Sequence, residues 1–160
     1  MLYDRIHQFN FPTTIRFGAN VIKELPAYLK QNNISAPLVV TDPNVAQLPF
    51  FKAILADLTN HGISVEVFSE IHKNPVKSDV YKGVDRWDAT GRDAVIGIGG
   101  GAGLDVSRAI LLRINHREDL FKYDDLVGGD IYVTNDVPHF ITVPTTSGTG
   151  SEVGRSAIIA

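Results

Sequence analysis

Short apolar stretches alternate along the chain with longer segments in which apolar residues recur every three or four positions. The short stretches are rich in β-branched residues or alternate apolar with polar side chains, and both patterns predict β-strands. These strands are expected at residues 13–18, 36–42, 63–70, 93–99 and 139–144. The longer segments have the period of an amphipathic helix. These helices are expected at residues 20–33, 48–62, 78–91 and 104–114.

Four residues mark where the predicted helices begin and end. Asn20 and Ser78 stand at the start of two helical segments, where a short polar side chain can accept a backbone N–H bond. Gly62 and Gly91 follow the last periodic residue of two others, the position at which glycine commonly ends a helix.

The alternation of strands and helices predicts the fold class. Strand, helix, strand at this spacing is typical of βαβ units with right-handed crossovers. We therefore expect an α/β fold, a Rossmann-like parallel sheet flanked by helices, forming one domain over residues 1–160. The pattern loosens into polar, turn-rich sequence at 115–138. The apolar run at 156–160 has the pattern of a buried strand that stops short, and we expect the chain to be part of a longer protein.

Composition narrows the class of protein. Hydrophobic residues make up 44% and charged residues 21% of the 160, as in ordinary globular domains. The net charge of −3 and the lack of a Lys/Arg cluster argue against a nucleic-acid partner. The chain has no cysteine, which excludes disulfides and thiolate ligands. No apolar run approaches the ~20 residues of a membrane span. The first residues do not resemble a signal peptide, so a cytoplasmic protein is expected.

A glycine-rich turn follows the predicted strand 93–99 and opens the next helix. The sequence Gly-Ile-Gly-Gly-Gly-Ala at 97–102 matches the G-x-G-x-x-G/A dinucleotide fingerprint. Unpaired backbone N–H groups at a helix start attract phosphate, and glycines let it approach closely. The usual fingerprint, however, occupies the first βα turn and has an acidic residue about 20 positions later. Here the carboxylate at a strand end is upstream, at Asp42, so a nucleotide site and a tight turn without a ligand both stay open.

A second glycine-rich loop, PTTSGTGSE at 144–152, follows the last predicted strand. It carries the hydroxyls of Thr145, Thr146 and Thr149, which suit phosphate and ribose oxygens. It lacks the lysine of a Walker loop, so nucleotide hydrolysis is not indicated. Read by itself, the loop is also compatible with an exposed turn held by its own hydroxyls.

Together these motifs resemble the amino-terminal domain of the iron-containing (group III) alcohol dehydrogenases, in the dehydroquinate-synthase-like superfamily. The family's GGGS-x-x-D-x-x-K pattern is approximated by GGGAGLDVSR at 99–108, and its PTTxGTGSE loop is met in full at 144–152. Its strand-terminal Thr-Asp matches Thr41-Asp42, and its Asn-Pro matches Asn74-Pro75. The resemblance spans essentially the whole chain.

The resemblance implies cofactor-binding roles for individual residues. Asp42 would accept hydrogen bonds from the adenosine ribose and favour NAD over NADP, and Asn74 would lie near the phosphates. The pyrophosphate would rest on Gly100, Gly101 and Ala102. Asp105 would bind near the nicotinamide half, and Thr145, Thr146 and Thr149 would line the nicotinamide and phosphate positions. The chain departs from the family at three positions: Ala102 replaces serine, Arg108 replaces lysine and Gly154 replaces threonine.

The resemblance also implies what lies outside these residues. The family holds a divalent metal, usually iron, with one Asp and three His in a helical second domain that would follow residue 160. The five histidines here have no i, i+4 spacing and are interpreted as surface residues, so no metal ligand and no catalytic residue is predicted. Trp87 is expected to pack against the sheet.

The sequence thus predicts the cofactor-binding domain of an NAD- and iron-dependent dehydrogenase. The full protein would transfer a hydride between nicotinamide and an alcohol, aldehyde or ketone, and this chain alone would be inactive. Pairing of strand 13–18 across a homodimer is a further implication of the resemblance. The alternatives are a nucleotide-binding module without catalysis and a relative of glycerol dehydrogenase or dehydroquinate synthase, although the full PTTxGTGSE loop disfavours those relatives.

Overall fold

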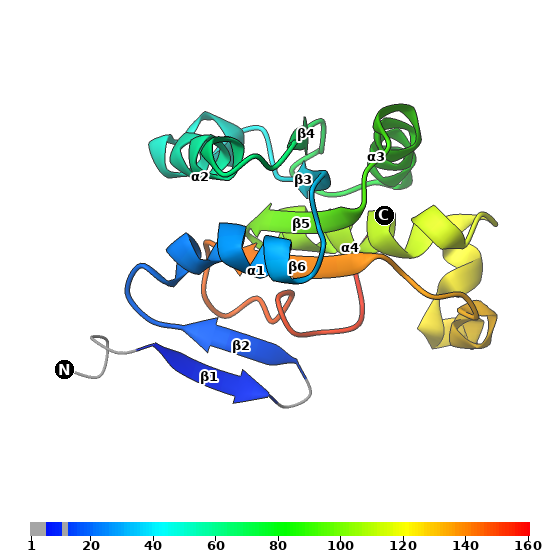
Figure 1. The fold of residues 1–160 in the computed structure, drawn as a ribbon. Coiled ribbons are helices and arrows are strands. Elements are labelled where there is room, and N and C mark those ends of the chain that lie inside the picture. Colours follow the sequence, from blue (N-terminus) through cyan, green and yellow to red (C-terminus); the bar gives the residue numbers. More distant parts are fainter. Residues whose placement is uncertain (1–5, 11–12) are drawn as a thin grey trace.

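A four-stranded parallel sheet forms the centre of the chain in a computed structural model, which describes residues 6–10 and 13–160. Its strands lie in the order β4 (Glu66–Phe68), β3 (Pro37–Val40), β5 (Ala94–Gly99) and β6 (His139–Pro144). Every neighbouring pair runs parallel. The predicted Rossmann-like α/β sheet is confirmed (Figure 1).

Helices cover both faces of this sheet. Residues of α3 (Lys77–Thr90) and α4 (Gly101–Asn115) share one apolar cluster with Leu38 and Val40 of β3. Residues of α1 (Leu25–Gln31) and α2 (Pro49–Asn60) form a second apolar cluster with Val39, on the opposite face of the sheet. Side chains of a strand alternate between the two faces of the sheet. Because helices cover both faces here, β3 must be apolar at every position. Trp87 packs against the first cluster, as expected.

The predicted helix over residues 20–33 is divided in two. A 3₁₀ helix, η1 (Val21–Glu24), precedes α1, and Pro26 lies in the first turn of α1. A proline there is tolerated because the N–H groups of the first turn have no intrahelical partner. The prediction that Asn20 caps this helix with its side chain is wrong: its backbone is left-handed, with φ 61°, and its side chain makes no capping bond.

The amino end of α3 also differs from prediction. The helix begins at Lys77, with Val76 at the capping position, so Ser78 lies inside it and is not the cap. The carboxylate of Asp79 does the capping instead, since its Oδ2 accepts the N–H of Val76 at 3.1 Å. The predicted helix ends are confirmed: Gly91 is the C-cap of α3 with φ 62°, and Gly62, with φ 80°, follows α2.

An antiparallel hairpin stands apart from the parallel sheet. It pairs β1 (His7–Asn10) with β2 (Thr14–Phe17), which confirms the strand predicted at 13–18, whereas β1 was not predicted. Figure 1 shows the hairpin outside the main sheet, on the side of α1 and β6. Residues 1–5, part of the stretch read as lacking a signal peptide, lie outside the described residues. In the described part of the chain, no helix has the length and apolarity needed to cross a bilayer.

The segment between α4 and β6 consists of three short 3₁₀ helices, η3 (Leu120–Tyr123), η4 (Asp125–Val127) and η5 (Gly129–Tyr132). The interpretation of all five histidines as surface residues is wrong for His116, which is 3% exposed. It follows α4 and accepts the N–H of Asn135 on Nε2 at 3.0 Å, joining the two ends of this segment.

The apolar run at 156–160 forms no strand of the sheet. Its last residue instead pairs with the segment that leads into α3. The N–H of Ala160 donates to the carbonyl of Pro75, and its carbonyl accepts the N–H of Lys77, both at 2.9 Å. The strand-like appearance of this run thus reflects partial burial, since Ala157 and Ile159 pack against the α3/α4 cluster.

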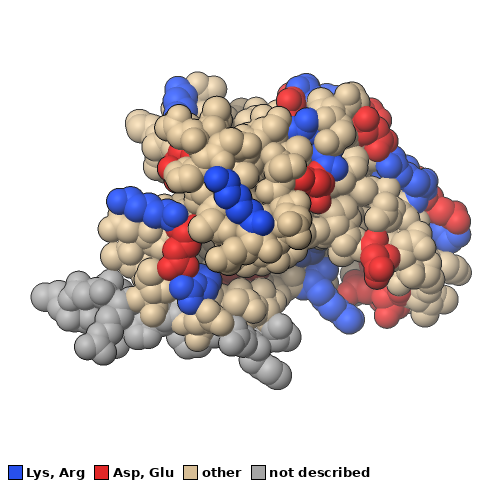
Figure 2. All heavy atoms as spheres, viewed as in Figure 1, with Lys and Arg blue, Asp and Glu red and all other residues tan. Residues whose placement is uncertain are grey.

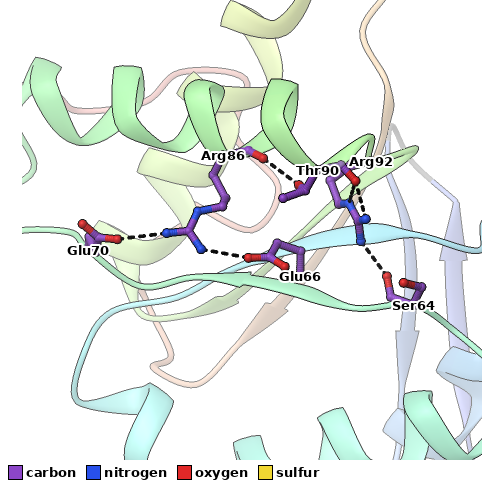
Figure 3. A network of polar contacts seen from close by, with 6 residues as sticks. All are labelled: Ser64, Glu66, Glu70, Arg86, Thr90 and Arg92. Atoms are coloured by element: carbon purple, nitrogen blue, oxygen red, sulfur yellow. Dashed lines mark hydrogen bonds and ion pairs between the residues drawn. The ribbon is translucent and has the colours of Figure 1, made fainter.

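Charged side chains secure the edge strand β4 to α3. Figure 3 shows Arg86 of α3 between Glu66 and Glu70, with nitrogen–oxygen distances of 2.8 and 3.3 Å. Arg92 donates to the carbonyls of Thr90 and Ser64, which joins the end of α3 to the approach to β4. These bonds hold both ends of β4 against α3. On the face in Figure 2, charges of both signs are interspersed.

Candidate functional site

The strand order of the sheet has a switch point between β3 and β5, which are neighbours in the sheet but not in the sequence. From β3 the chain passes to β4 on one side, then crosses back to β5 on the other. Open α/β sheets bind ligands beyond the carboxyl ends of the strands at such a switch point. At this switch point, Asp42 follows β3 and Gly99 ends β5. The two residues are close, because a Cβ placed on Gly99 would lie 3.5 Å from Asp42 Oδ2.

In the described part of the chain, Asp42 uses one of its two carboxylate oxygens for hydrogen bonds. Oδ1 accepts the N–H groups of Asn44 at 2.9 Å and Val45 at 3.0 Å, which orients the carboxylate at the start of the 3₁₀ helix η2 (Val45–Gln47). Among the described residues, nothing donates to Oδ2. The side chain is therefore held in place with one anionic acceptor left for a ligand.

The glycine turn brings the start of α4 close to the Asp42 carboxylate. Gly99 has φ 152°, a backbone conformation that side chains disfavour, and Gly100 is the N-cap of α4. The helix begins at Gly101, three residues earlier than predicted, so its first N–H groups belong to glycine and alanine. These N–H groups have no intrahelical acceptor and carry the positive end of the helix dipole.

The loop after β6 lies against the same turn. The N–H of Thr145 donates to the carbonyl of Gly99 at 2.9 Å, extending the β5–β6 pairing by one bond. Thr146 Oγ1 lies 3.2 Å from where a Cβ on Gly100 would be, and the Thr149 side chain lies 3.5 Å from the equivalent point on Gly101. A side chain on Gly100 would therefore crowd Thr146, whereas a Cβ on Gly101 would be in ordinary contact with Thr149.

Arg108 of α4 anchors the far part of this loop. Its guanidinium donates to the carbonyls of Ser151 and Ser156 and lies 5.6 Å from the ring of Phe140. Burial lowers the pKa of Arg108, although Asp105 and Glu152 oppose that effect. The planar guanidinium carries N–H donors on separate nitrogens and can reach two carbonyls at once, whereas the three N–H donors of the lysine that the family resemblance implies here share one nitrogen.

Replacing Arg108 with lysine is therefore expected to loosen the loop. Amide hydrogen exchange of residues 149–156 should become faster by about tenfold, the effect of losing one hydrogen bond worth ~1 kcal/mol or somewhat more. Arg16→Lys is the matched control, because Arg16 is exposed and its partners Glu24 and Gln8 belong to other segments. Equal exchange rates in the Arg108 variant and the wild type would contradict the anchoring role.

A cavity of about 650 Å³ opens where these elements meet. Its walls bring together five of the nine predicted cofactor residues. These are Asp42, Gly100, Gly101, Ala102 and Thr146. The rest of the wall is formed by Pro43, Asn44, Ile71, His72, Lys73 and Gly103.

The other four predicted residues do not line this cavity. Asn74 is exposed and directly follows the wall residue Lys73. Asp105 is 8% exposed and lies 3.8 Å from Arg108. Thr145 and Thr149 are exposed on the loop, where Thr149 Oγ1 pairs with Glu152 at 3.3 Å. Their cofactor contacts stay predictions.

His72 and Lys73 belong to the wall and were not predicted. They follow β4, whose end lies beside that of β3, and they precede the Asn-Pro pair. The signal that could have identified them is their place after a strand of the parallel sheet, the same criterion that selected Asp42 and the glycine turn.

The cavity has the chemistry that a dinucleotide requires. It combines a helix amino terminus for phosphate, a turn without side chains for close approach, and a carboxylate oxygen for hydroxyl groups. Its volume lies within the range of small-molecule and cofactor sites. Next to it, in the described part of the chain, Thr41 Oγ1 is buried without a hydrogen-bond partner. Among the described residues, no three His, Cys, Asp or Glu side chains are grouped to hold a metal ion.

Comparison with known proteins assigns the chain to a family. The model of the family described as "Iron-containing alcohol dehydrogenase" matches residues 12–160. The chain belongs to the iron-containing alcohol dehydrogenases. The resemblance inferred from the two glycine-rich loops is thereby confirmed.

Individual relatives in this family are dehydrogenases. The chain is 30% identical over 155 residues to choline dehydrogenase of Bacillus subtilis (strain 168), and the match covers 97% of this chain and 38% of the relative. It is 33% identical over 147 residues to 4-hydroxybutyrate dehydrogenase of Cupriavidus necator, covering 92% and 38%. The structure of a 1,3-propanediol oxidoreductase shares its fold with a TM-score of 0.75 and 27% identity, covering 84% of this chain and 34% of that one. The chain thus spans little more than a third of each relative's length.

Proposed function

We propose that residues 1–160 form the NAD-binding domain of an iron-dependent dehydrogenase that interconverts an alcohol with an aldehyde or ketone. The observation that carries this proposal is the switch-point cavity, where the Asp42 carboxylate faces the glycine turn at the start of α4. Family membership supports dehydrogenase chemistry for the protein as a whole.

Each part of the cavity would bind a different part of the cofactor. Asp42 Oδ2 accepts hydrogen bonds from the adenosine ribose, and its negative charge disfavours the 2′-phosphate of NADP. The backbone N–H groups of Gly101 and Ala102 donate to the pyrophosphate at the helix start. Thr146 supplies a hydroxyl beside the same turn.

The chemistry supplied by bound NAD is hydride transfer at its nicotinamide ring. This chain would contribute binding and orientation, through the glycine turn at the start of α4 and Thr146 of the PTTSGTGSE loop. The metal, which acts on the substrate oxygen as a Lewis acid, would be held by the second domain that the family resemblance implies. The substrate cleft would then lie between the two domains.

Calorimetric titration of the 160-residue chain with NAD and with NADP tests this proposal. We expect NAD to bind more tightly than NADP by at least about tenfold, the size of one charge-assisted hydrogen bond. We also expect no alcohol oxidation by this chain with NAD and added Fe²⁺, because the implied metal ligands lie outside these residues. A folded chain that binds neither nucleotide, or one that turns over substrate, would contradict the proposal.

A further inference from the structure

The wall of the cavity opposite the glycine turn contains a histidine that is oriented by a buried carboxylate. The Nδ1 atom of His72 lies 2.7 Å from Oδ1 of Asp79, and Asp79 is 0% exposed. Oδ2 of the same carboxylate accepts the backbone N–H of His72 and the N–H of Val76, each at 3.1 Å. The Asp79 carboxylate therefore fixes the Nδ1 edge of the imidazole ring, while the His72 side chain is 63% exposed.

The ionisation state of Asp79 determines which nitrogen of the His72 ring carries the proton. Burial raises the pKa of Asp79, but the N–H groups of Val76 and His72 and the His72 ring outweigh it, so the pKa lies below its ordinary value. An ionised carboxylate only accepts hydrogen bonds, so Nδ1 must be the donor. In a neutral ring, Nε2 is then an acceptor only.

An acceptor at Nε2 cannot bind the phosphates of a dinucleotide. The oxygens of a pyrophosphate diester carry no proton near neutral pH and can only accept hydrogen bonds. His72 can therefore bind such a group only when Nε2 is protonated as well, and the bond is then charge-assisted.

Charged groups of both signs surround His72. The carboxylates of Asp79 on α3 and of Asp42 at the end of β3 are negative, whereas Lys73 and the amino end of α3 are positive. Lys77, in the first turn of α3, is paired with Asp119. A bound phosphate adds one more negative charge beside the ring.

We propose that His72 is a phosphate-binding residue of the cofactor site and that its imidazole takes up a proton when NAD binds. This inference rests on the proposed function, because it requires a dinucleotide in the cavity. Lys73, on the same wall, adds a second cation for the anionic ligand. NAD affinity is then expected to rise as the pH falls from 8 to 6, because only the doubly protonated ring can donate from Nε2 to a phosphate.

Titration of the chain with NAD at pH 6, 7 and 8, in two buffers of different ionisation enthalpy, measures this proton uptake directly. The wild type is expected to take up a fraction of one proton at pH 7 and to bind about threefold to tenfold more tightly at pH 6 than at pH 8. His72→Gln, which can donate but cannot be protonated, should show neither effect. His61→Gln is the matched control: His61 lies beside Asp57 at 3.4 Å but does not line the cavity, so its loss should change nothing.

The outcomes separate this inference from the function on which it rests. If NAD binds the wild type without proton uptake, or if His72→Gln retains the uptake, the role of His72 is overturned and the NAD site stands. If the folded wild type does not bind NAD at any of the three pH values, both are overturned. Loss of uptake in His72→Gln alone, with circular dichroism unchanged, supports the proposal.

Discussion

Replacing Asp42 with asparagine is expected to reduce the preference for NAD over NADP by more than about tenfold, because the substitution removes the charge that repels a 2′-phosphate. Asparagine keeps an oxygen at the position of Oδ1, where Asp42 accepts the N–H groups of Asn44 and Val45. The 3₁₀ helix that follows β3 should therefore stay folded. Calorimetric titration with both nucleotides gives the two dissociation constants.

Two further variants separate the charge of Asp42 from its structural role. Asp42→Ala removes the charge and the capping oxygen together, so it should lose the same discrimination and some thermal stability as well. Asp57→Asn, on α2, removes a carboxylate of equal charge that does not line the cavity and should leave the preference unchanged. A preference that is identical in the wild type and Asp42→Asn would show that another group selects the cofactor.

Replacing Gly97 with alanine is expected to lower the free energy of unfolding by about 1–3 kcal/mol, the usual cost of overpacking a core. Gly97 lies in β5 beneath α4, and a Cβ there would be 2.3 Å from Ser107 Oγ and 3.0 Å from Ser107 Cβ. Helix α4 would have to move away from the sheet, and the glycine turn at its start would move with it. Urea denaturation of the two proteins measures the difference.

A compensating substitution tests the cause of this destabilisation. Ser107→Gly removes the two nearest of the three crowded atoms and leaves Leu104 Cδ2 at 3.2 Å, so the double variant should recover part of the stability that Gly97→Ala loses. A coupling of about 1 kcal/mol or more between the two substitutions would show that the loss arises from this contact. Purely additive effects would assign it elsewhere in β5.

Local signals in the sequence were sufficient for most of the sheet and for half of the cavity. The strand β3 could be predicted because its apolar residues are contiguous, and β5 because it runs directly into glycines. Asp42, Gly100 and Thr146 could be predicted as site residues because each follows a strand of a parallel sheet. All such strands present their carboxyl ends at the same edge, so position along the chain implies proximity in space.

Helix starts were less predictable, because capping depends on contacts that the periodicity of apolar residues does not reveal. Ser78 fits the usual rule for a helix cap, but Asp79 caps α3 from within its first turn. The first apolar residue of α4 is Leu104, yet that helix begins at Gly101. Glycines have no side chain to show a helical period.

The amino-acid sequence by itself determined the parallel α/β fold, its family and the glycine turn of the candidate site, since all three depend on short-range patterns and motifs. Only the tertiary structure decided which residues share the cavity. It placed His72 and Lys73 on the wall opposite the glycines and left Asn74 outside. It also paired His72 with the buried Asp79, seven positions away. The physical reason is that strand order and the packing of α3 against the sheet bring these groups together, and neither is encoded in the local sequence around them.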